Sequence, residues 1–260
     1  MASGHLPLAP GWAVRHRDGR MVGSLPLARL ARLGLLLSAA GIVTLHLLPR
    51  PVLAATTGQV VLYDPRLSFL SEYVRTQYGP LMAFNFLTLA GAASVAACAL
   101  RAAGLGREAK LVAVAAIFLV LLAVFPTDLT DLRQDGSACD LPQRIEPCTW
   151  VGRVHNPLST VVFCCLGATW LSLASRRRPE WRSVVWAGVA CALLAAGLVG
   201  GSAVYLRQIP EVGRHWVGMM QRSVVAPALI WLWLLLGRLE RVAGDRTRGG
   251  RERASGATTP

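Results

Sequence analysis

The chain has 260 residues, of which 53% are hydrophobic and only 16% charged, and its mean hydropathy is +0.46. This composition is typical of a polytopic membrane protein and argues against a soluble or disordered chain. The net charge of +13 would suit nucleic acid, but the basic residues lie between apolar runs and in the tails, where membrane topology places them. We therefore expect membrane lipids, and no nucleic acid, as partners.

Six apolar runs are each long enough, or nearly so, to cross a hydrocarbon core of about 30 Å. We predict an all-α fold, a six-transmembrane-helix bundle over residues 27–237. The predicted spans are about 27–48, 81–100, 111–126, 157–175, 184–206 and 216–236. Residues 1–26 are predicted to be a cytoplasmic tail, and residues 238–260 a basic, disordered one. Val52-Leu53-Ala54 resembles a signal-peptide cleavage site, but the first run is long for a signal peptide, and we favour a retained helix.

An N-in, C-in orientation places most of the 27 Lys and Arg residues on the cytoplasmic side, in agreement with the positive-inside rule. We therefore predict a multi-pass protein of the cell (cytoplasmic or inner) membrane. The loop between the third and fourth spans then lies outside, and it carries Cys139 and Cys148. In an oxidising compartment we expect these two to form a disulfide. A zinc pair is the alternative, although their spacing fits no usual zinc pattern.

Two local features of the sequence predict further structure. Asp64-Pro65 is a good helix start, and the apolar residues from there to Tyr78 recur at helical spacing. This pattern predicts a short amphipathic helix at the membrane surface. The small residues of the Ala90–Ser94 run predict a surface where another helix approaches closely.

In the predicted topology, unusual polar residues gather at the extracytoplasmic ends of the helices. They are His46, Ser71, Glu72, Asp128, His155, His215, Gln221 and Arg222. Arg222 lies about 9 Å into the last span, at about 1.5 Å per residue, and a charge there needs a partner or a water-filled cavity. We predict a binding site made of Glu72, Gln221 and Arg222, in which Arg222 pairs with Asp128 or Glu72 or recognises an anionic head group. The alternative is a structural ion pair, or an Arg222 side chain that reaches the lipid headgroups.

Two kinds of catalytic chemistry are open to the same residues. Asp128, His155 and His215 can ligate zinc, which takes carboxylate and imidazole ligands and activates water. Zinc is the one cofactor that the sequence suggests, although no H-x-x-x-H or H-E-x-x-H pair supports it. Ser71, His155 and Asp128 can instead form a nucleophilic relay, although no G-x-S-x-G motif accompanies them. The inner halves of the spans are almost wholly apolar, which argues against a through-pore and favours a site open on one side.

Several short segments occur in an order that resembles one family. They are Phe69-Leu-Ser-Glu-Tyr, Tyr78-Gly-Pro-Leu-Met, Phe125-Pro-Thr-Asp, Gly152-Arg-Val-His and Gln221-Arg222. Their order resembles the uncharacterised bacterial and archaeal six-helix membrane family called domain-of-unknown-function family 998, over most of the chain. The resemblance implies a six-helix fold and no particular activity. By position it marks Ser71, Asp128, His155 and Arg222 as the family-pattern residues.

A more distant similarity is to membrane-embedded ceramidases and progestin-receptor-like hydrolases, which use a Ser, an Asp and several His residues around zinc. This chain departs from them in having six predicted spans rather than seven and no paired His on its last helix. Three functions remain open. We favour a protein that binds a lipid or a small anionic molecule near the extracytoplasmic face. The alternatives are a metal-dependent membrane hydrolase and a structural or accessory membrane subunit; the sequence does not indicate the oligomeric state.

Overall fold

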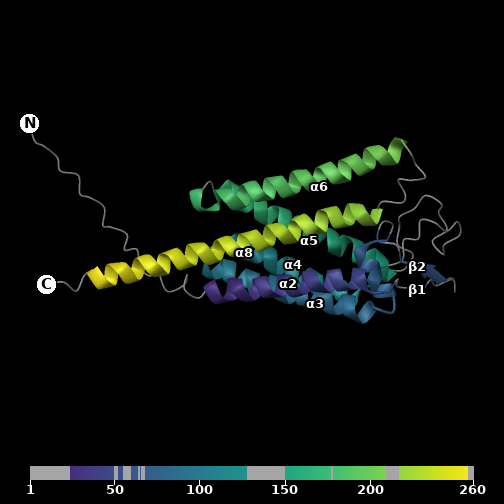
Figure 1. Cartoon of the computed structure of the whole chain (residues 1–260), viewed down its shortest axis with the longest axis horizontal. Helices are drawn as coiled ribbons and strands as arrows, with labels where there is room; N and C mark the ends of the chain where they lie inside the picture. The colour runs from purple at the N-terminus through teal and green to yellow at the C-terminus, as the bar shows by residue number, and fades with distance from the viewer. Residues whose placement is uncertain are drawn as a thin grey trace, which may run out of the picture.

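A computed structural model of the chain consists mainly of long helices, with one short hairpin (Figure 1). The structure describes residues 24–49, 52–54, 60–63, 65, 68–127, 150–176, 178–208 and 217–256, so residues 1–23 of the predicted N-terminal tail lie outside it. The long helices are α2 (Ser24–Leu47), α3 (Gly79–Ala102), α4 (Gly106–Val124), α5 (Trp150–Ser175), α6 (Arg182–Gln208) and α8 (Val217–Gly256). Strands β1 (Val52–Ala54) and β2 (Val60–Leu62) form an antiparallel pair. The predicted helical fold is confirmed, and the short hairpin is a feature that the sequence did not predict.

Within the described residues, four of these helices contain segments long and apolar enough to cross a membrane. The segments are Leu25–Leu47, Gly79–Ala102, Trp150–Ser175 and Gln221–Asp245. They make the chain a helical membrane protein. α4 has 19 residues, and its first turns carry Arg107, Glu108 and Lys110, so its uninterrupted apolar stretch is shorter.

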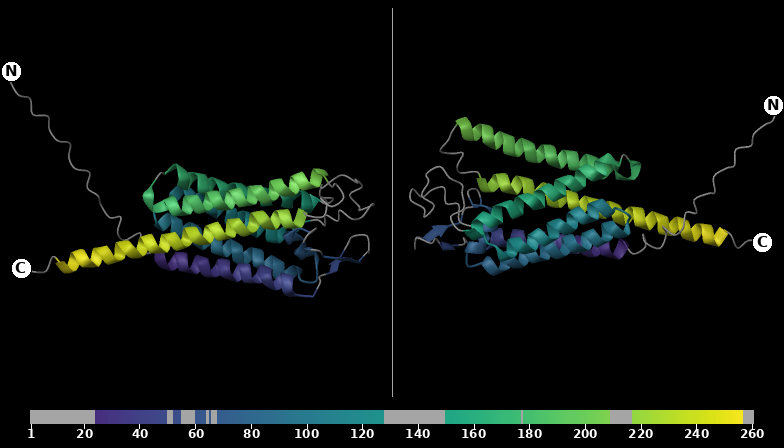
Figure 2. Two further views of the ribbon diagram at one scale, coloured as in Figure 1. Left: turned by 45° about the horizontal axis from the view of Figure 1, so that its top comes forward. Right: turned by 180° about the vertical axis from the view of Figure 1, so that it is seen from behind.

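The helices form an open arc rather than a closed ring. α3 packs on α2 and on α4, α4 packs on α5, and α8 packs on both α2 and α6. Figure 2 shows α6 and α8 side by side along one edge of the molecule. Within the described residues, α5 touches α6 only slightly and makes few contacts with α8. Direct helix packing therefore does not close the side of the bundle between α5 and α8.

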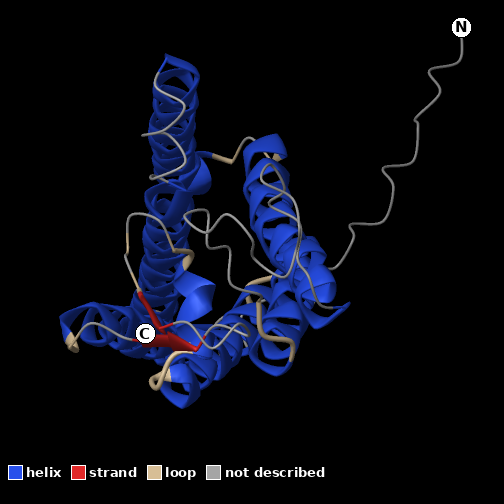
Figure 3. Cartoon of the chain, turned by 90° about the vertical axis from the view of Figure 1, so that its right-hand side faces the viewer, coloured by secondary structure: helices blue, strands red, loops and turns tan. Residues whose placement is uncertain are grey.

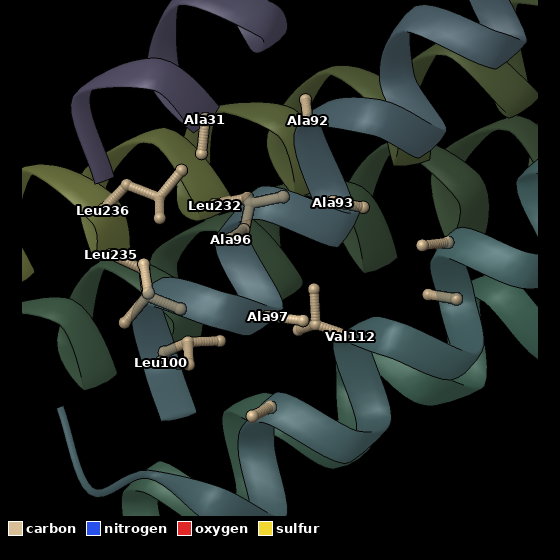
Figure 4. Close-up of a cluster of buried hydrophobic side chains, with 14 of the residues drawn as sticks. Ala31, Ala92, Ala93, Ala96, Ala97, Leu100, Val112, Leu232, Leu235 and Leu236 are labelled. Carbon is tan, nitrogen blue, oxygen red and sulfur yellow. The ribbon is translucent and has the colours of Figure 1, made fainter. Parts of the chain in front are cut away.

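Small residues on α3 allow its neighbours to approach closely. Ala92, Ala96 and Ala97 are buried, and they lie among side chains of α2, α4 and α8 (Figure 4). A Cβ added to Gly34 of α2 would lie 2.8 Å from the Cβ of Ala92, which is inside van der Waals contact. The prediction that the Ala90–Ser94 run lies at a close helix contact is confirmed.

The two ends of the bundle carry different short elements. At one end, which we call the hairpin end, lie β1, β2 and the 3-10 helix η1 (Leu70–Arg75) (Figure 3). At the opposite end, η2 (Pro179–Trp181) joins α5 to α6. The start of α2 and the C-terminal part of α8 also lie at this opposite end (Figure 1).

The segment around η1 differs from the predicted amphipathic surface helix. It forms one short 3-10 helix, and four consecutive residues, Leu70 to Tyr73, are all buried. Consecutive residues point in different directions around a helix, so η1 is enclosed on several sides rather than on one face. The prediction was wrong because contacts with α8, described below, override the local periodicity. The predicted N-cap, Asp64, lies outside the described residues.

The C-terminal segment also differs from its prediction. Residues 238–256, predicted to be disordered, continue α8 as a helix, and residues 257–260 lie outside the described part. Arg238 Nε donates a hydrogen bond to the Glu180 carbonyl oxygen at 2.6 Å. Three apolar residues of this segment are buried: Leu239, Val242 and Ala243. They recur at helical spacing, a signal that the basic composition of the tail as a whole concealed.

Candidate functional site

Arg222 on α8 connects three parts of the chain at the hairpin end. Its Nε donates to Nε2 of His46, at the end of α2, at 3.1 Å. One terminal nitrogen donates to the carbonyl oxygens of Ser68 and Gly218 at 3.0 and 2.9 Å, and the other donates to the Tyr63 hydroxyl. We call these five residues the Arg222 network. Of the five N–H groups of a guanidinium, all but one are therefore used within the protein.

The acceptors in the Arg222 network are uncharged. His46 Nδ1 lies 2.8 Å from the Ile42 carbonyl oxygen. Because a carbonyl can only accept, Nδ1 carries the proton and Nε2 accepts from Arg222. Burial raises the pKa of Tyr63, so its hydroxyl stays protonated. That hydroxyl in turn donates to the Phe69 carbonyl oxygen at 3.1 Å.

This arrangement differs from the predicted ion pair of Arg222. The guanidinium bonds neutral groups rather than Glu72, and the other predicted partner, Asp128, lies outside the described residues. Carbonyl and hydroxyl dipoles can satisfy a charge at this depth as well as a carboxylate can. Arg222 therefore fixes the loop before η1 to α2 and α8.

The first turn of α8 lies directly against that loop. A Cβ on Gly218 would lie 2.6 Å from the Pro65 carbonyl oxygen and closer still to that of Ser68. Only glycine fits such a contact without movement of the loop. Gln221 Oε1 accepts a hydrogen bond from the Leu70 backbone N–H at 2.6 Å. Side chains of α8 thus hold the backbone that leads into η1.

His155 lies near the start of α5, which begins at Trp150, before the predicted span boundary at Pro157. Its side chain is buried, with 3% of the residue exposed. Nδ1 lies 2.7 Å from the carbonyl oxygen of Phe125, at the end of α4. Since that oxygen can only accept, Nδ1 is the donor, and Nε2 is the acceptor nitrogen when the ring is neutral. The bond fixes the orientation of the imidazole between α4 and α5.

A cavity of about 100 Å³ lies between η1 and helices α2, α3, α4, α5 and α8. It holds several times the volume that one water molecule needs. Most of its lining is apolar, for example Met82, Leu122, Val162, Phe163, Leu166 and Leu229. Its polar lining residues are Ser71, Asn85, His155, Ser159 and Gln221. The described residues that line the cavity include no Asp, Glu, Lys or Arg.

Ser71 and Asn85 are polar residues at this cavity for which the described part of the chain provides no hydrogen-bond partner. Both are buried, with 7% and 5% exposed, and neither side chain makes a hydrogen bond within the described part of the chain. A Cβ on Gly41 of α2 would lie 2.8 Å from Asn85 Oδ1, so the glycine makes room for this amide. Buried polar groups normally have a hydrogen-bond partner. A partner for these two is expected among the contents of the cavity.

A comparison with protein families agrees with the order of short segments in the sequence. The model of a family described as "Protein of unknown function (DUF998)" matches residues 51–238. The chain belongs to the DUF998 family. The matched region includes η1, α3, α4, α5, α6 and most of α8, and thus nearly all of the cavity lining. No curated protein and no solved structure matches the chain.

The structure of this DUF998 protein brings three of the predicted site residues together. Ser71, His155 and Gln221 line the same cavity although they come from η1, α5 and α8. Glu72, next to Ser71, is buried with 1% exposed. Arg222 belongs to the Arg222 network and is not part of the cavity lining.

Four of the predicted residues lie outside the described part of the chain. They are Asp128 and His215, of the zinc set, and Cys139 and Cys148, of the disulfide. Within the described ranges there is no group of three or more residues that could hold a metal. Only one of the three proposed zinc ligands, His155, lies in those ranges. The zinc site and the disulfide therefore stay predictions.

Sequence reasoning did not assign three residues of the site. Asn85 and Ser159 line the cavity, and Tyr63 belongs to the Arg222 network. An Asn within an apolar run is a signal that could have indicated an internal polar site. Tyr63 gave no such signal, because it lies in a loop outside the apolar runs.

Proposed function

We propose that this DUF998 protein binds an amphipathic lipid in the cavity between η1, α3, α4, α5 and α8. The polar part of the lipid would lie at Ser71, Asn85 and His155, and a hydrocarbon part among the apolar side chains. The observation that carries the proposal is that Ser71 and Asn85 are buried, line a mostly apolar cavity and make no side-chain hydrogen bond within the described residues. Ligand sites usually combine a mostly apolar lining with a few convergent polar groups.

The order of lining residues along the helices supports a lipid with one polar end. Asn85, His155 and Gln221 each lie within the first two turns of their helices, counted from the hairpin end. Leu89, Leu166 and Leu229 lie farther along the same three helices. At about 1.5 Å per residue, most of the polar groups are therefore near the hairpin end, beside apolar Leu70 and Met82, and the lining beyond Ser159 is apolar. This is the order of a headgroup followed by a chain.

The weak packing of α5 on α8 supports entry from the bilayer. Ser159, Val162 and Phe163 of α5 line the cavity, as do Val225 and Ala228 of α8. These two helices nevertheless make few contacts with each other within the described residues. An apolar molecule could pass between them from the surrounding lipid without crossing water. A soluble ligand would gain nothing from such an opening.

The proposal includes six spans, an N-in, C-in orientation and a place in the cell (inner) membrane. The distribution of Lys and Arg supports this orientation. The start of α2 and the C-terminal part of α8 lie at the same end of the bundle (Figure 1), as an even number of crossings requires. The hairpin end and the polar part of the cavity would then face the extracytoplasmic side.

Co-purified lipid tests the proposal. Ala228 lines the cavity, so Ala228→Phe should fill it. Ile230, on the same helix, is 55% exposed and faces away, so Ile230→Phe is the matched control. We expect lipid extracted from purified wild-type and Ile230→Phe protein, measured by mass spectrometry, to contain one enriched species that Ala228→Phe protein lacks. Equal lipid in all three proteins would overturn the proposal and leave a structural or accessory role.

A membrane hydrolase remains a second candidate, because Ser71 and His155 line one cavity and Nε2 of a neutral His155 would be an acceptor. In such a reaction His155 would take the proton of the Ser71 hydroxyl as that oxygen attacks an ester carbonyl, and would give the proton to the alcohol that leaves as the ester bond breaks; water would then release the acyl group from Ser71. A fluorophosphonate probe tests this candidate. Labelling that disappears in both Ser71→Ala and His155→Phe proteins would support it. No labelling of wild-type protein would remove it. The metal-dependent version has its own test, namely zinc content by elemental mass spectrometry in wild type beside His155→Ala.

A further inference from the structure

We infer that the polar group of the bound lipid is uncharged, a hydroxyl or carbonyl as in a diacylglycerol, and not a phosphate. The inference rests on the proposed function, since it specifies the ligand of the same cavity. It differs from the anionic ligand that the sequence suggested through Arg222.

The first reason is the chemistry of the lining. The polar side chains at the cavity are two hydroxyls, two amides and an imidazole, on Ser71, Ser159, Asn85, Gln221 and His155. Among the described lining residues there is no Lys or Arg to balance a negative charge. An ionised phosphate that enters such a site loses its hydration without gaining the permanent counter-charge of a Lys or Arg side chain, which is very costly. An uncharged hydroxyl or carbonyl loses much less hydration free energy, and hydrogen bonds with the lining can compensate for that loss.

The second reason is that Arg222, the cation that the sequence assigned to the site, already donates hydrogen bonds within the protein. Arg222 donates to Ser68, Gly218, Tyr63 and His46. For Arg222 to bind a phosphate bidentately, at least one of these bonds would have to break. That would release the loop before η1. Leu70 and Ser71, the first residues of η1, form part of the cavity wall. Arg222 therefore acts as a positioning residue for the site and does not contact the ligand.

The third reason is the match between the unsatisfied groups and an uncharged polar group. The Ser71 hydroxyl both donates and accepts, and the Asn85 amide has a donor end and an acceptor end. Gln221 accepts a hydrogen bond from Leu70 through Oε1. Its amide nitrogen carries two N–H groups that can donate to a ligand. A hydroxyl that donates to one partner and accepts from another satisfies such a set. A phosphate, which at neutral pH mainly accepts, would leave the acceptor end of Asn85 unpaired.

Two lipids that differ in one group test the inference. Dioleoylglycerol and dioleoylphosphatidic acid have the same chains, and the second has a phosphate where the first has a hydroxyl. Each is added to detergent-solubilised full-length protein, and bound lipid is counted by native mass spectrometry. Ala228→Phe is the cavity-filling variant and Ile230→Phe its control, while Val225→Phe fills the cavity from a second position if Ala228→Phe protein does not fold.

We expect dioleoylglycerol to form a one-to-one complex that the filling variant loses and Ile230→Phe keeps. Dioleoylphosphatidic acid should bind the same site at least about tenfold more weakly, because its charge is buried without a partner. If the phosphatidic acid complex is equally strong and is equally sensitive to the filling variant, the uncharged-headgroup inference fails and the proposed lipid function stands. If neither complex is sensitive to the filling variant, both the inference and the proposed function fail.

Discussion

Two clusters of buried polar side chains in this protein are built in opposite ways. In the first, which we call the Glu108 cluster, Glu108 is fully buried and accepts from Arg176 at 2.7 and 2.8 Å and from Ser172 Oγ at 2.8 Å. It joins α4 to α5 at the end opposite the hairpin. At the cavity, Ser71 and Asn85 are nearly as buried, but neither makes a hydrogen bond within the described part of the chain.

The difference separates a structural cluster from a candidate site. A buried network whose members satisfy one another stabilises the arrangement of helices that brings them together. A buried polar group without a partner in the chain costs stability, and where such a group lines a cavity its partner is expected among the contents of the cavity. By this criterion the Glu108 cluster belongs to the architecture and the cavity residues belong to ligand binding.

The largest expected effect comes from breaking the Glu108 cluster. Arg176→Ala leaves a fully buried carboxylate without its two strongest donors, so we expect the free energy of unfolding to fall by about 3 kcal/mol. Denaturation in mixed micelles measures it. Arg178→Ala is the control, because its pair with Glu180 is long, at 3.7 Å, and half exposed; its loss should cost under about 1 kcal/mol. Equal losses in the two variants would mean that the buried cluster has no special structural role.

A smaller effect is expected at the Arg222 network. Arg222→Met removes all of its donors to the loop before η1, and we expect a loss of about 2 kcal/mol because each net hydrogen bond is modest. Hydrogen exchange of the backbone amides of η1 should speed up at the same time. Arg241→Met, an exposed position on the same helix, should change neither quantity. Faster exchange spread evenly over the bundle, and not centred on η1, would argue against a positioning role for Arg222.

A substitution at Gly41 offers a third test. Gly41 does not line the cavity, but its neighbour Asn85 does. Gly41→Ala places a methyl group 2.8 Å from Asn85 Oδ1, and we expect a loss of about 1 kcal/mol from overpacking together with weaker binding of dioleoylglycerol. Gly91→Ala is the control, since a Cβ there meets nothing within 4 Å. Alanine should stabilise that helix position by about 0.5 kcal/mol. Unchanged lipid binding in Gly41→Ala protein would show that Asn85 does not contact the ligand.

The helices themselves could be predicted from the sequence, since long apolar runs leave few other structures in a membrane. The convergence of Ser71, His155 and Gln221 was also predictable in outline, because alternating helix directions bring their ends together. The short form of η1 was not, because it depends on the hydrogen bond that Gln221 accepts from Leu70 and the one that Arg222 donates to Ser68, and both partners lie some 150 residues away in the chain. Local periodicity carries no information about such distant partners.

The partners of Arg222 illustrate the same limit for the site. A charge within an apolar run indicates that a partner exists, but not whether the partner is a carboxylate or a set of neutral dipoles. That choice depended on Tyr63 and on the backbone around Ser68, both in a loop with no sequence signal. The Glu108 cluster was missed for a related reason, since Glu108 lies among Arg107 and Lys110 and is typical of a solvated loop by composition.

The smallest expected effect gives the sharpest contrast between the two clusters, because the same substitution is made in both. Ser172→Ala removes a donor to Glu108 and should cost about 1 kcal/mol. Ser71→Ala removes a buried hydroxyl that has no partner in the described chain, so in lipid-free protein it should leave stability unchanged within about 0.5 kcal/mol or raise it. Binding of dioleoylglycerol should respond in the opposite order: about threefold to tenfold weaker for Ser71→Ala and unchanged for Ser172→Ala. If Ser71→Ala instead destabilises lipid-free protein as much as Ser172→Ala does, Ser71 has a partner inside the chain. The distinction between a self-satisfied cluster and a ligand-satisfied one would then no longer hold at this residue, and the assignment of the cavity would depend on Asn85 alone.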